Sequence, residues 1–255
     1  MTVKIHSDYE HLKEIIENIP SGMLEGDQVL RANRNLLYKT AFAGAFFAVK
    51  RYKRPNLFNR FVYTFIRKTK ARRSYEYAEQ LLGLGIGTAA PVAYIEIKKH
   101  GLFESGYFIS EFISEPLLSG VEGHPDQEKI LYDFAGFSAD MHRKRIFHGD
   151  YNADNIFFRR EGDGYRFFLI DNNRIRFKKP TQRRCSDDLK RLKFSLPLQA
   201  HIFEQYALKQ GWNPEIFCGR VFLKRGVDFP GRLKRELRNL FKERKNCKMI
   251  KYAHR

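Results

Sequence analysis

Apolar and polar positions in the first half of the chain follow the pattern of strands. Aromatic and β-branched residues cluster in residues 28–32, 35–42 and 45–52, with turn-like breaks at 32–35 and 43–44. These clusters predict a small antiparallel sheet, preceded by a short helical opening. Strand character returns at residues 91–99 and 105–113. The first half is therefore predicted to run from strands through helices back to strands.

Two segments between these strands have a helical period. In residues 56–67 the apolar side chains recur at helical spacing, with Arg60 and Arg67 off the stripe, which predicts an amphipathic helix. Its apolar positions are Leu57, Phe58, Phe61, Val62, Phe65 and Ile66. A second helix is predicted over roughly residues 70–85. It ends in the glycines of LGLGIG, which we interpret as a helix stop and turn.

From about residue 125 the pattern becomes mainly helical. Ile130, Phe134, Phe137 and Met141 mark one apolar face. The segment NIFFRREGDGYRFFLID, residues 155–171, interrupts this pattern with two apolar runs around a glycine- and aspartate-rich turn. Such an arrangement predicts a β-hairpin.

The open end of this hairpin carries candidate chemistry. Asn155 begins the first strand and Asp171 ends the second, so antiparallel pairing should make them neighbours, with Asp150 one short loop away. Two carboxylates and an amide oxygen form a hard, oxygen-rich site that suits Mg²⁺ with help from phosphate oxygens. A carboxylate just outside the metal shell can accept the proton of an attacking hydroxyl group. These parts indicate phosphoryl transfer.

Phosphoryl transfer also needs a cation on the phosphates that are not transferred. Lys50, in FAVKRY at the end of a predicted strand, is the candidate, and strand alternation points it to the opposite face from Val49. A carboxylate should hold this lysine. Glu76 on the following helix is the best placed, although Glu79, one turn later, is an alternative.

Composition narrows the class of protein. The chain has 255 residues, 43% of them hydrophobic, which is enough for one large domain or two packed lobes. The formal net charge of +18 implies an anionic partner. Cys185, Cys218 and Cys247 form no metal-binding or disulfide pattern, and a reducing compartment fits best. The opening residues lack a signal-peptide core, and the longest apolar run is about half of a membrane span. A cytoplasmic location is expected.

Several of these motifs together resemble a known family. HGDYNADN is similar to the catalytic loop of protein-kinase-like proteins, LIDNNR to their metal-binding aspartate and FAVK to their nucleotide lysine. More narrowly, roughly residues 28–195 resemble the lipopolysaccharide kinase family, whose members phosphorylate Kdo or heptose of the lipopolysaccharide inner core. The resemblance implies an α+β, two-lobed protein-kinase-like fold, with an N-lobe at 1–112 and a C-lobe at 113–255.

The resemblance also implies residue roles and partners. It makes Asp150 the catalytic aspartate and Asn155 and Asp171 the ligands of Mg²⁺. ATP would be the co-substrate and a lipid A-core glycolipid the acceptor. For the nucleotide site it implies that Lys50 binds phosphates, that Glu76 pairs with Lys50, and that Glu111 and Phe112 lie where backbone groups meet adenine.

The chain departs from protein kinases in ways that disfavour a protein substrate. Residues 32–35, ANRN, stand in place of a glycine-rich loop, and Asp171 is followed by Asn172 and Asn173. No activation segment is recognisable. A kinase of another small molecule or of protein side chains remains an alternative. So does a pseudokinase module that keeps the pocket as a scaffold.

Other polar and basic residues admit two interpretations. His148 is expected to be a structural residue behind the loop and Arg174 a brace for it, while Asp187 and Asp188 are interpreted as a helix start. Residues 50–73 contain ten lysines and arginines and no acid. They form either a solvated surface or, with the basic segment 231–251, a contact with an anionic membrane. No nucleic-acid module is visible, so nucleic acid is not expected as a partner.

Overall fold

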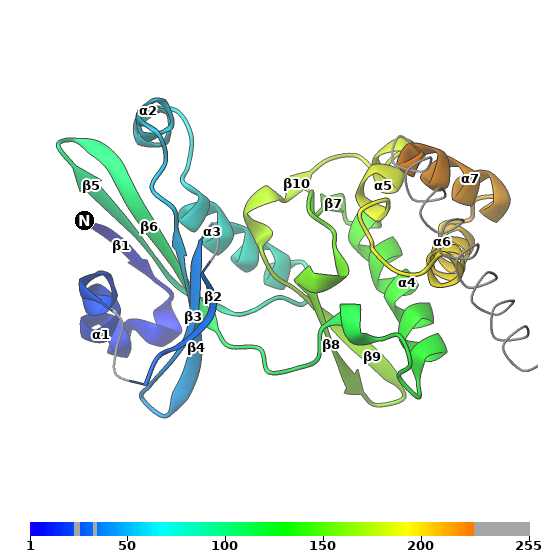
Figure 1. The fold of residues 1–255 in the computed structure, drawn as a ribbon, viewed down its shortest axis with the longest axis horizontal. Coiled ribbons are helices and arrows are strands. Elements are labelled where there is room, and N and C mark those ends of the chain that lie inside the picture. Colours follow the sequence, from blue (N-terminus) through cyan, green and yellow to red (C-terminus); the bar gives the residue numbers. More distant parts are fainter. Residues whose placement is uncertain (23–25, 33–34, 227–255) are drawn as a thin grey trace, which may run out of the picture.

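The computed structural model describes residues 1–22, 26–32 and 35–226, so the basic segment 231–251 lies outside the described residues. Two lobes lie side by side (Figure 1). The first holds a six-stranded sheet and the second is mainly helical. None of the described helices combines the length and the apolar content that crossing a bilayer requires.

The sheet of the first lobe is antiparallel throughout, in the order β1-β5-β6-β4-β3-β2. Its strands are β1 (Thr2–Ile5), β2 (Gln28–Ala32), β3 (Leu36–Phe42), β4 (Ala45–Tyr52), β5 (Pro91–Lys99) and β6 (Leu102–Glu111). The predicted strands are confirmed. The predicted helical opening is present at residues 7–18, but residues 2–5 before it form a further strand that pairs with β5, with Val3 opposite Ile95. Four residues are too few to display a period, so only the partner strand reveals this one.

Helices cover both faces of the sheet, and strand alternation decides which residues meet them. The 3₁₀ turns η1 (Ser7–Leu12) and η2 (Ile19–Ser21) and helix α1 (Lys13–Asn18) share a buried cluster with Val49. Helix α3 (Lys70–Gly83) packs on β5 and β6, where Ala71 and Tyr75 cluster with Tyr52. Val49 thus faces α1, and Lys50 faces the α3 side, as the alternation predicted.

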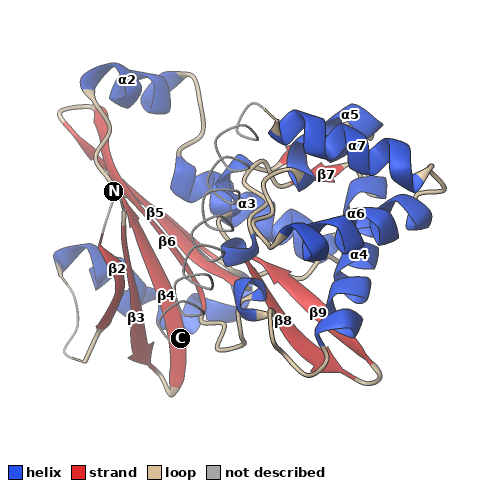
Figure 2. Cartoon of the chain, turned by 45° about the vertical axis from the view of Figure 1, so that its right-hand side comes forward, coloured by secondary structure: helices blue, strands red, loops and turns tan. Residues whose placement is uncertain are grey.

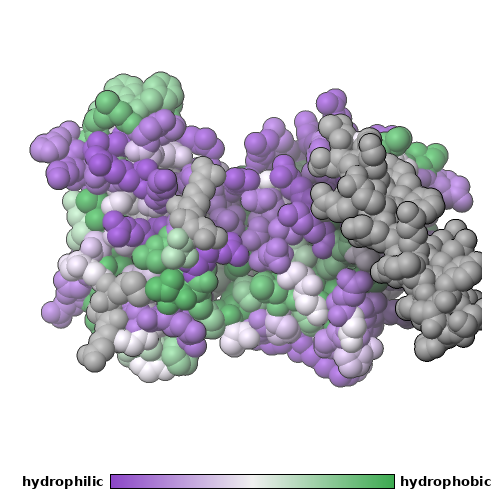
Figure 3. Space-filling view, viewed as in Figure 1, coloured by the Kyte–Doolittle hydropathy of each residue, from purple (hydrophilic) through white to green (hydrophobic). Residues whose placement is uncertain are grey.

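Helix α2 (Leu57–Phe65) forms where an amphipathic helix was predicted, but its apolar stripe faces outward. Phe58 is 73% exposed, and the neighbouring Leu57, Phe61, Phe65 and Ile66 are also exposed. Arg60 is instead the side chain turned inward, at 9% exposure. It pairs with Glu104 at 2.7 Å and donates from Nε to the carbonyl of Phe103 at 2.8 Å. A polar anchor therefore holds α2 to the lobe, and the apolar side is left uncovered (Figure 3).

The second lobe is built around helix α4 (Gln127–Arg143). Ile130, Phe134 and Met141 of its predicted apolar face are fully buried, and Phe137 packs against the same core. Helices α5 (Gln182–Leu189), α6 (Leu196–Lys209) and α7 (Pro214–Arg225) lie on the side of the hairpin away from the sheet (Figure 2). The remaining elements are η3 (Leu118–Gly120), η4 (Ala153–Asn155), η5 (Asn172–Arg174), β7 (Ile146–Phe147), β8 (Ile156–Glu161), β9 (Gly164–Leu169) and β10 (Arg176–Phe177).

The segment after α3 ties the two lobes together. The N–H of Leu169 donates to the carbonyl of Gly87 at 2.9 Å, and the Thr88 hydroxyl donates to the carbonyl of Leu169 at 2.6 Å. A Cβ on Gly87 would lie 2.2 Å from the carbonyl oxygen of Phe167, so only glycine permits this approach. These contacts bring the end of the β8–β9 hairpin against the first lobe.

Candidate active site

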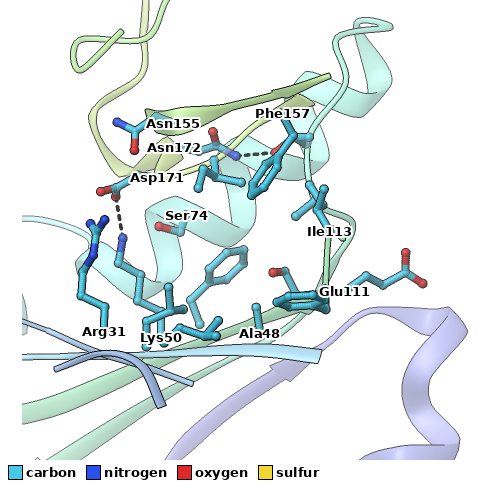
Figure 4. Close-up of a pocket in the computed structure, with 18 of the residues that line it drawn as sticks. Arg31, Ala48, Lys50, Ser74, Glu111, Ile113, Asn155, Phe157, Asp171 and Asn172 are labelled. Atoms are coloured by element: carbon cyan, nitrogen blue, oxygen red, sulfur yellow. Dashed lines mark hydrogen bonds and ion pairs between the residues drawn. The ribbon is translucent and has the colours of Figure 1, made fainter. Parts of the chain in front are cut away.

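A cavity of about 240 Å³ lies between the sheet of the first lobe and the β8–β9 hairpin. Figure 4 shows Asn155, Asp171 and Lys50 at one end of it and Glu111 and Ile113 at the other. Apolar side chains from both lobes line its middle, among them Leu37, Ala48, Leu117 and Phe157. An apolar slot with charged groups at one end has the form of a nucleotide site.

Lys50 and Asp171 meet across the two lobes. The ammonium nitrogen of Lys50 lies 2.8 Å from Oδ1 of Asp171. Asp171 has φ 61° and ψ 43°, a left-handed conformation that aspartate tolerates better than most residues, and it also accepts from the side chain of Asn173. Burial works to raise the pKa of Asp171, but Lys50 outweighs burial and holds that pKa below its ordinary value. The carboxylate is therefore charged and directed into the cavity.

Asn155 is oriented by the loop in front of it. Its Nδ2 donates to the carbonyl of Asp150 at 2.9 Å, and its own carbonyl accepts from the N–H of Ile170 at 2.9 Å. With Nδ2 engaged, Oδ1 is the atom left to bind a ligand. Asn155 and Asp171 both line the cavity. Among the described residues, no group of three or more His, Cys, Asp and Glu side chains is arranged to hold a metal ion. The amide oxygen and carboxylate therefore fit Mg²⁺ only as part of a set completed by phosphate oxygens and water.

Asp150 lies at the surface end of the same loop. Its Oδ2 is 3.0 Å from a guanidinium nitrogen of Arg174, and its side chain is about one-third exposed. The contact fits the brace that was expected of Arg174. His148 is buried and its Nε2 lies 2.9 Å from the carbonyl oxygen of Ile170, so it stands behind the loop as predicted. Asp150 can therefore be reached by a hydroxyl group from solvent.

Asp188 holds this loop in place, a role that sequence reasoning missed. Its two carboxylate oxygens accept the backbone N–H groups of His148 at 2.8 Å and Gly149 at 2.9 Å. The interpretation of Asp188 as a helix start is wrong, since α5 begins at Gln182 and Asp188 lies near its C-terminal end. Gly149 has φ 72°, and a Cβ there would lie 2.7 Å from the carbonyl oxygen of Arg174. The turn before Asp150 therefore requires glycine.

A buried histidine, His142, contacts Asp188. Nε2 of His142 lies 3.5 Å from Asp188, and Nδ1 lies 2.8 Å from the hydroxyl of Tyr206. Burial works to lower the pKa of His142, but its interactions with Asp188 and Cys185 outweigh burial and raise this pKa to about 9. Burial likewise works to raise the pKa of Asp188, but His142 keeps it below its ordinary value. The pair is therefore charged at neutral pH.

The predicted pairing of Lys50 with Glu76 is not what the structure contains. Glu76 contacts Lys68 at 2.7 Å and Arg72 at 2.8 Å, and the carboxylate on Lys50 is Asp171. Ser74 is the residue of α3 that lines the same cavity as Lys50. Glu76 lies two residues later, which is about 200° further around the helix. Neither Glu76 nor the alternative Glu79 lines that cavity.

The Ser74 side chain is engaged in its own contact. Its hydroxyl is 2.7 Å from that of Tyr52, in the buried space beneath Lys50. A neutral hydrogen bond thus occupies the place where sequence reasoning expected an ion pair.

The segment between the lobes has a free backbone donor one residue beyond the predicted pair Glu111 and Phe112. The N–H of Glu111 donates to the carbonyl of Ala90 and that of Phe112 to the carbonyl of Phe46. The Glu111 side chain accepts from the Tyr9 hydroxyl at 2.7 Å and points away from the cavity (Figure 4). Ile113 lines the cavity, and its N–H has no hydrogen bond among the described residues. Among the described residues, the free backbone donor at this end of the cavity is therefore Ile113.

Arg31 is a second residue that sequence reasoning did not single out. It comes from β2, and its guanidinium lies at the same end of the cavity as Asp171 (Figure 4). It precedes the segment where a glycine-rich loop was missing. The described residues thus supply two cations, Arg31 and Lys50, at the end of the cavity where phosphates would lie. Arg31 could have been found only by pairing β2 with β3 in the correct register.

Comparison with solved structures shows which class of protein this fold defines. The fold matches a structure of "WaaP in complex with acyl carrier protein" with a TM-score of 0.56, at 16% identity over 87% of this chain and all of that one. It also matches an aminoglycoside-3'-phosphotransferase of type VIII (TM-score 0.56, 11% identity, 85% of this chain and 98% of that one). A third match is the streptomycin-ATP-APH(2")-IIa ternary complex, with a TM-score of 0.50 and 12% identity. This match covers 89% of this chain and 90% of that one. The chain has a kinase-like fold.

A family model makes this assignment more specific. The model of the Lipopolysaccharide kinase (Kdo/WaaP) family matches residues 48–212, which include Lys50, Asp150, Asn155 and Asp171. The chain belongs to this family. A search among curated proteins finds no match to the chain.

Proposed function

We propose that the protein transfers the γ-phosphoryl group of ATP to a hydroxyl group of Kdo or heptose in the lipopolysaccharide inner core. The observation that carries this proposal is the contact of Lys50 with Asp171 across the cleft, which brings the nucleotide cation and a metal ligand together. Family membership supports the lipopolysaccharide acceptor. The cleft separates a nucleotide-binding lobe, residues 1–112, from a catalytic lobe, residues 113–255.

Each residue has a distinct task in this reaction. Lys50 and Arg31 hold the phosphates that are not transferred, and Ile113 donates to adenine from its N–H. Asn155 and Asp171 would hold Mg²⁺, which would supply positive charge to neutralise the phosphates. Glu111 and Phe112 shape the adenine end through backbone and packing.

Asp150 acts on the acceptor. The hydroxyl oxygen bonds to the γ-phosphorus as the bond from that phosphorus to the β–γ bridging oxygen breaks, and ADP leaves. The proton of the hydroxyl group passes to the Asp150 carboxylate. Arg174, at 3.0 Å, holds this carboxylate in place. Asp188 fixes the loop so that Asp150 faces the acceptor.

The acceptor is embedded in a membrane, and α2 suits that setting. Its exposed stripe of Leu57, Phe58, Phe61, Phe65 and Ile66 would enter the interface of an anionic leaflet, with Arg67 and Lys68 on the headgroups. The proposed location is the cytoplasmic face of the inner membrane. Arg60 takes no part in this contact, because it is buried against Glu104.

The proposal is tested by assaying purified protein with Mg²⁺, ATP and defined Kdo–lipid A acceptors. Asp150→Ala should lower phosphate transfer by at least about 100-fold, while Asp163→Ala, in the hairpin turn, should leave it unchanged. Mass spectrometry should find one added phosphate on the sugar. Equal turnover in the wild type and Asp150→Ala would refute the enzymatic role and leave a binding module. Transfer to other small molecules or proteins, but not to the glycolipid, would refute the acceptor.

A further inference from the structure

A second cavity, of about 770 Å³, borders the catalytic loop and shares no lining residue with the nucleotide cavity. Its wall comes from the end of α2, from α3, from the catalytic loop and from residues 174–191. Eight lysine and arginine side chains line it, against two aspartates. The basic residues are Arg67, Lys68, Arg73, Arg174, Arg176, Lys178, Arg184 and Arg191. In Figure 3, hydrophilic side chains cover the surface around β10, where part of this wall lies.

The two aspartates do not balance this charge. Asp187 is engaged by Lys224 at 2.9 Å and by Lys190 at 3.5 Å. Asp188 is buried and accepts from the loop N–H groups beside His142. Neither carboxylate contacts a basic residue of the cavity wall within the described residues. The cavity therefore carries a net excess of positive charge.

Four of the basic side chains have neither an ion pair nor a side-chain hydrogen bond with any described residue. Arg67, Arg176, Lys178 and Arg191 come from different elements, yet all line this one cavity. Their proximity also affects a neighbour: burial and, after it, repulsion from Arg67 lower the pKa of Arg73. Collecting like charges in one hollow costs free energy, and an anionic ligand removes that cost.

The position of the cavity relates this charge to the reaction. Gly149 and Arg174 line it, and Arg174 contacts Asp150 at 3.0 Å. A molecule in the cavity therefore lies next to the carboxylate that accepts the hydroxyl proton. Ile66, an exposed residue at the end of α2, also lines the cavity. The cavity thus runs from the apolar surface of α2 to the catalytic loop, as an amphiphilic acceptor requires.

The geometry points to this cavity as the site that recognises an oxyanion, carboxylate or phosphate, carried by the acceptor beside the hydroxyl group that is phosphorylated. Arg176 and Arg191 are the specificity-determining residues. Both are exposed, free of ion pairs among the described residues, and outside the nucleotide cavity. This inference rests on the proposed function, and it adds that neutral sugars are poor acceptors.

Steady-state kinetics with matched acceptors test the inference. Arg176→Ala and Arg191→Ala should each raise the KM for an anionic acceptor about tenfold, as expected for the loss of one charge-assisted contact. The KM for ATP should stay unchanged, because neither residue lines the nucleotide cavity. Arg220→Ala, on α7 and outside the cavity, is the matched control and should alter neither constant.

Two chemically edited acceptors identify the source of the oxyanion. If the cavity binds the sugar carboxylate, esterifying it should remove the difference between wild type and Arg176→Ala. If it binds lipid A phosphate, removing the phosphates should do so instead. An equal effect of Arg176→Ala on all acceptors, neutral ones included, would overturn the inference.

A binding measurement separates this inference from the proposed function. With the nucleotide site saturated by Mg²⁺ and ADP, the wild type should bind inorganic phosphate more tightly than a protein carrying both Arg176→Ala and Arg191→Ala. Equal binding by both proteins would overturn the cavity assignment. Weaker binding by the double variant, together with no transfer to any lipopolysaccharide acceptor, would support the anion site and refute the proposed function.

Discussion

Replacing Asp188 by asparagine keeps the size of the side chain but removes the charge that positions the catalytic loop. In the structure Asp188 accepts two backbone N–H groups, from His148 and Gly149, and faces the protonated ring of His142. An asparagine oxygen can accept one of these donors, while its NH₂ group must face another donor. His142 loses its counter-charge at the same time.

The size of the effect follows from these contacts. Removing one partner of a buried charge pair costs about 3–5 kcal/mol, because the other charge is left uncompensated. A free energy of unfolding that is about 3 kcal/mol lower corresponds to a drop in Tm of roughly 6–12 °C for a chain of this length. Turnover should fall as well, since Gly149 immediately precedes Asp150.

The pH dependence provides the sharper test. His142 has a pKa of about 9 in the folded protein against 6.5 for the ordinary group, so its contribution to stability is fully present below pH 6.5 and is lost as the pH rises through about 9. The wild type should therefore lose up to about 3 kcal/mol over this range. In Asp188→Asn, burial favours neutral His142, and the decline should vanish or reverse. Urea denaturation at several pH values measures both profiles.

The neighbouring aspartate supplies the control. Asp187 is partly exposed and pairs with Lys224 and Lys190 at the surface, so Asp187→Asn should cost less than about 1 kcal/mol and keep the wild-type pH profile. Cys185 and Tyr206 also interact with His142, but they are unchanged in both variants. Parallel profiles for wild type and Asp188→Asn between pH 6.5 and 9 would refute the charged pair.

Three further predictions concern the cleft and α2. Lys50→Met should lower ATP turnover about 100-fold with secondary structure intact by circular dichroism, because the phosphates lose their main cation. Glu76→Ala should leave turnover unchanged and lower the free energy of unfolding by less than about 1 kcal/mol in urea denaturation, since its partners are at the surface. A loss of turnover as large as that of Lys50→Met would show that Glu76 reaches the lysine once ATP binds. Changing Phe58 and Ile66 together to serine should weaken sedimentation with anionic vesicles at least about tenfold, by the loss of apolar burial, whereas Leu223→Ser on α7, equally exposed, should not.

The features that sequence reasoning predicted are those set by local pattern. The strands around Lys50 show clear alternation, and the hairpin from 155 to 171 brings Asn155 and Asp171 together because antiparallel strands must meet at their outer ends. The side of β4 on which Lys50 lies follows from the same alternation.

The features that it missed depend on contacts between distant segments. Asp188 holds a loop forty positions earlier in the chain, and no spacing rule connects the two. The rotation of α3 decides whether Ser74 or Glu76 faces the lysine, and both faces of that helix carry polar residues. For α2, the pattern identified an apolar stripe correctly but could not say which side would be covered, because the decisive contact is the pairing of Arg60 with Glu104.

The hydrogen bond between Tyr52 and Ser74 has a consequence for regulation. In kinases whose strand lysine pairs with a carboxylate on the helix, an outward movement of that helix breaks the ion pair and inactivates the enzyme. Here the carboxylate that holds Lys50 is Asp171 of the other lobe, and α3 contributes only the Ser74 hydroxyl bonded to Tyr52. Rotation of α3 therefore does not remove the partner of Lys50. In the proposed kinase this partnership depends instead on how the two lobes meet.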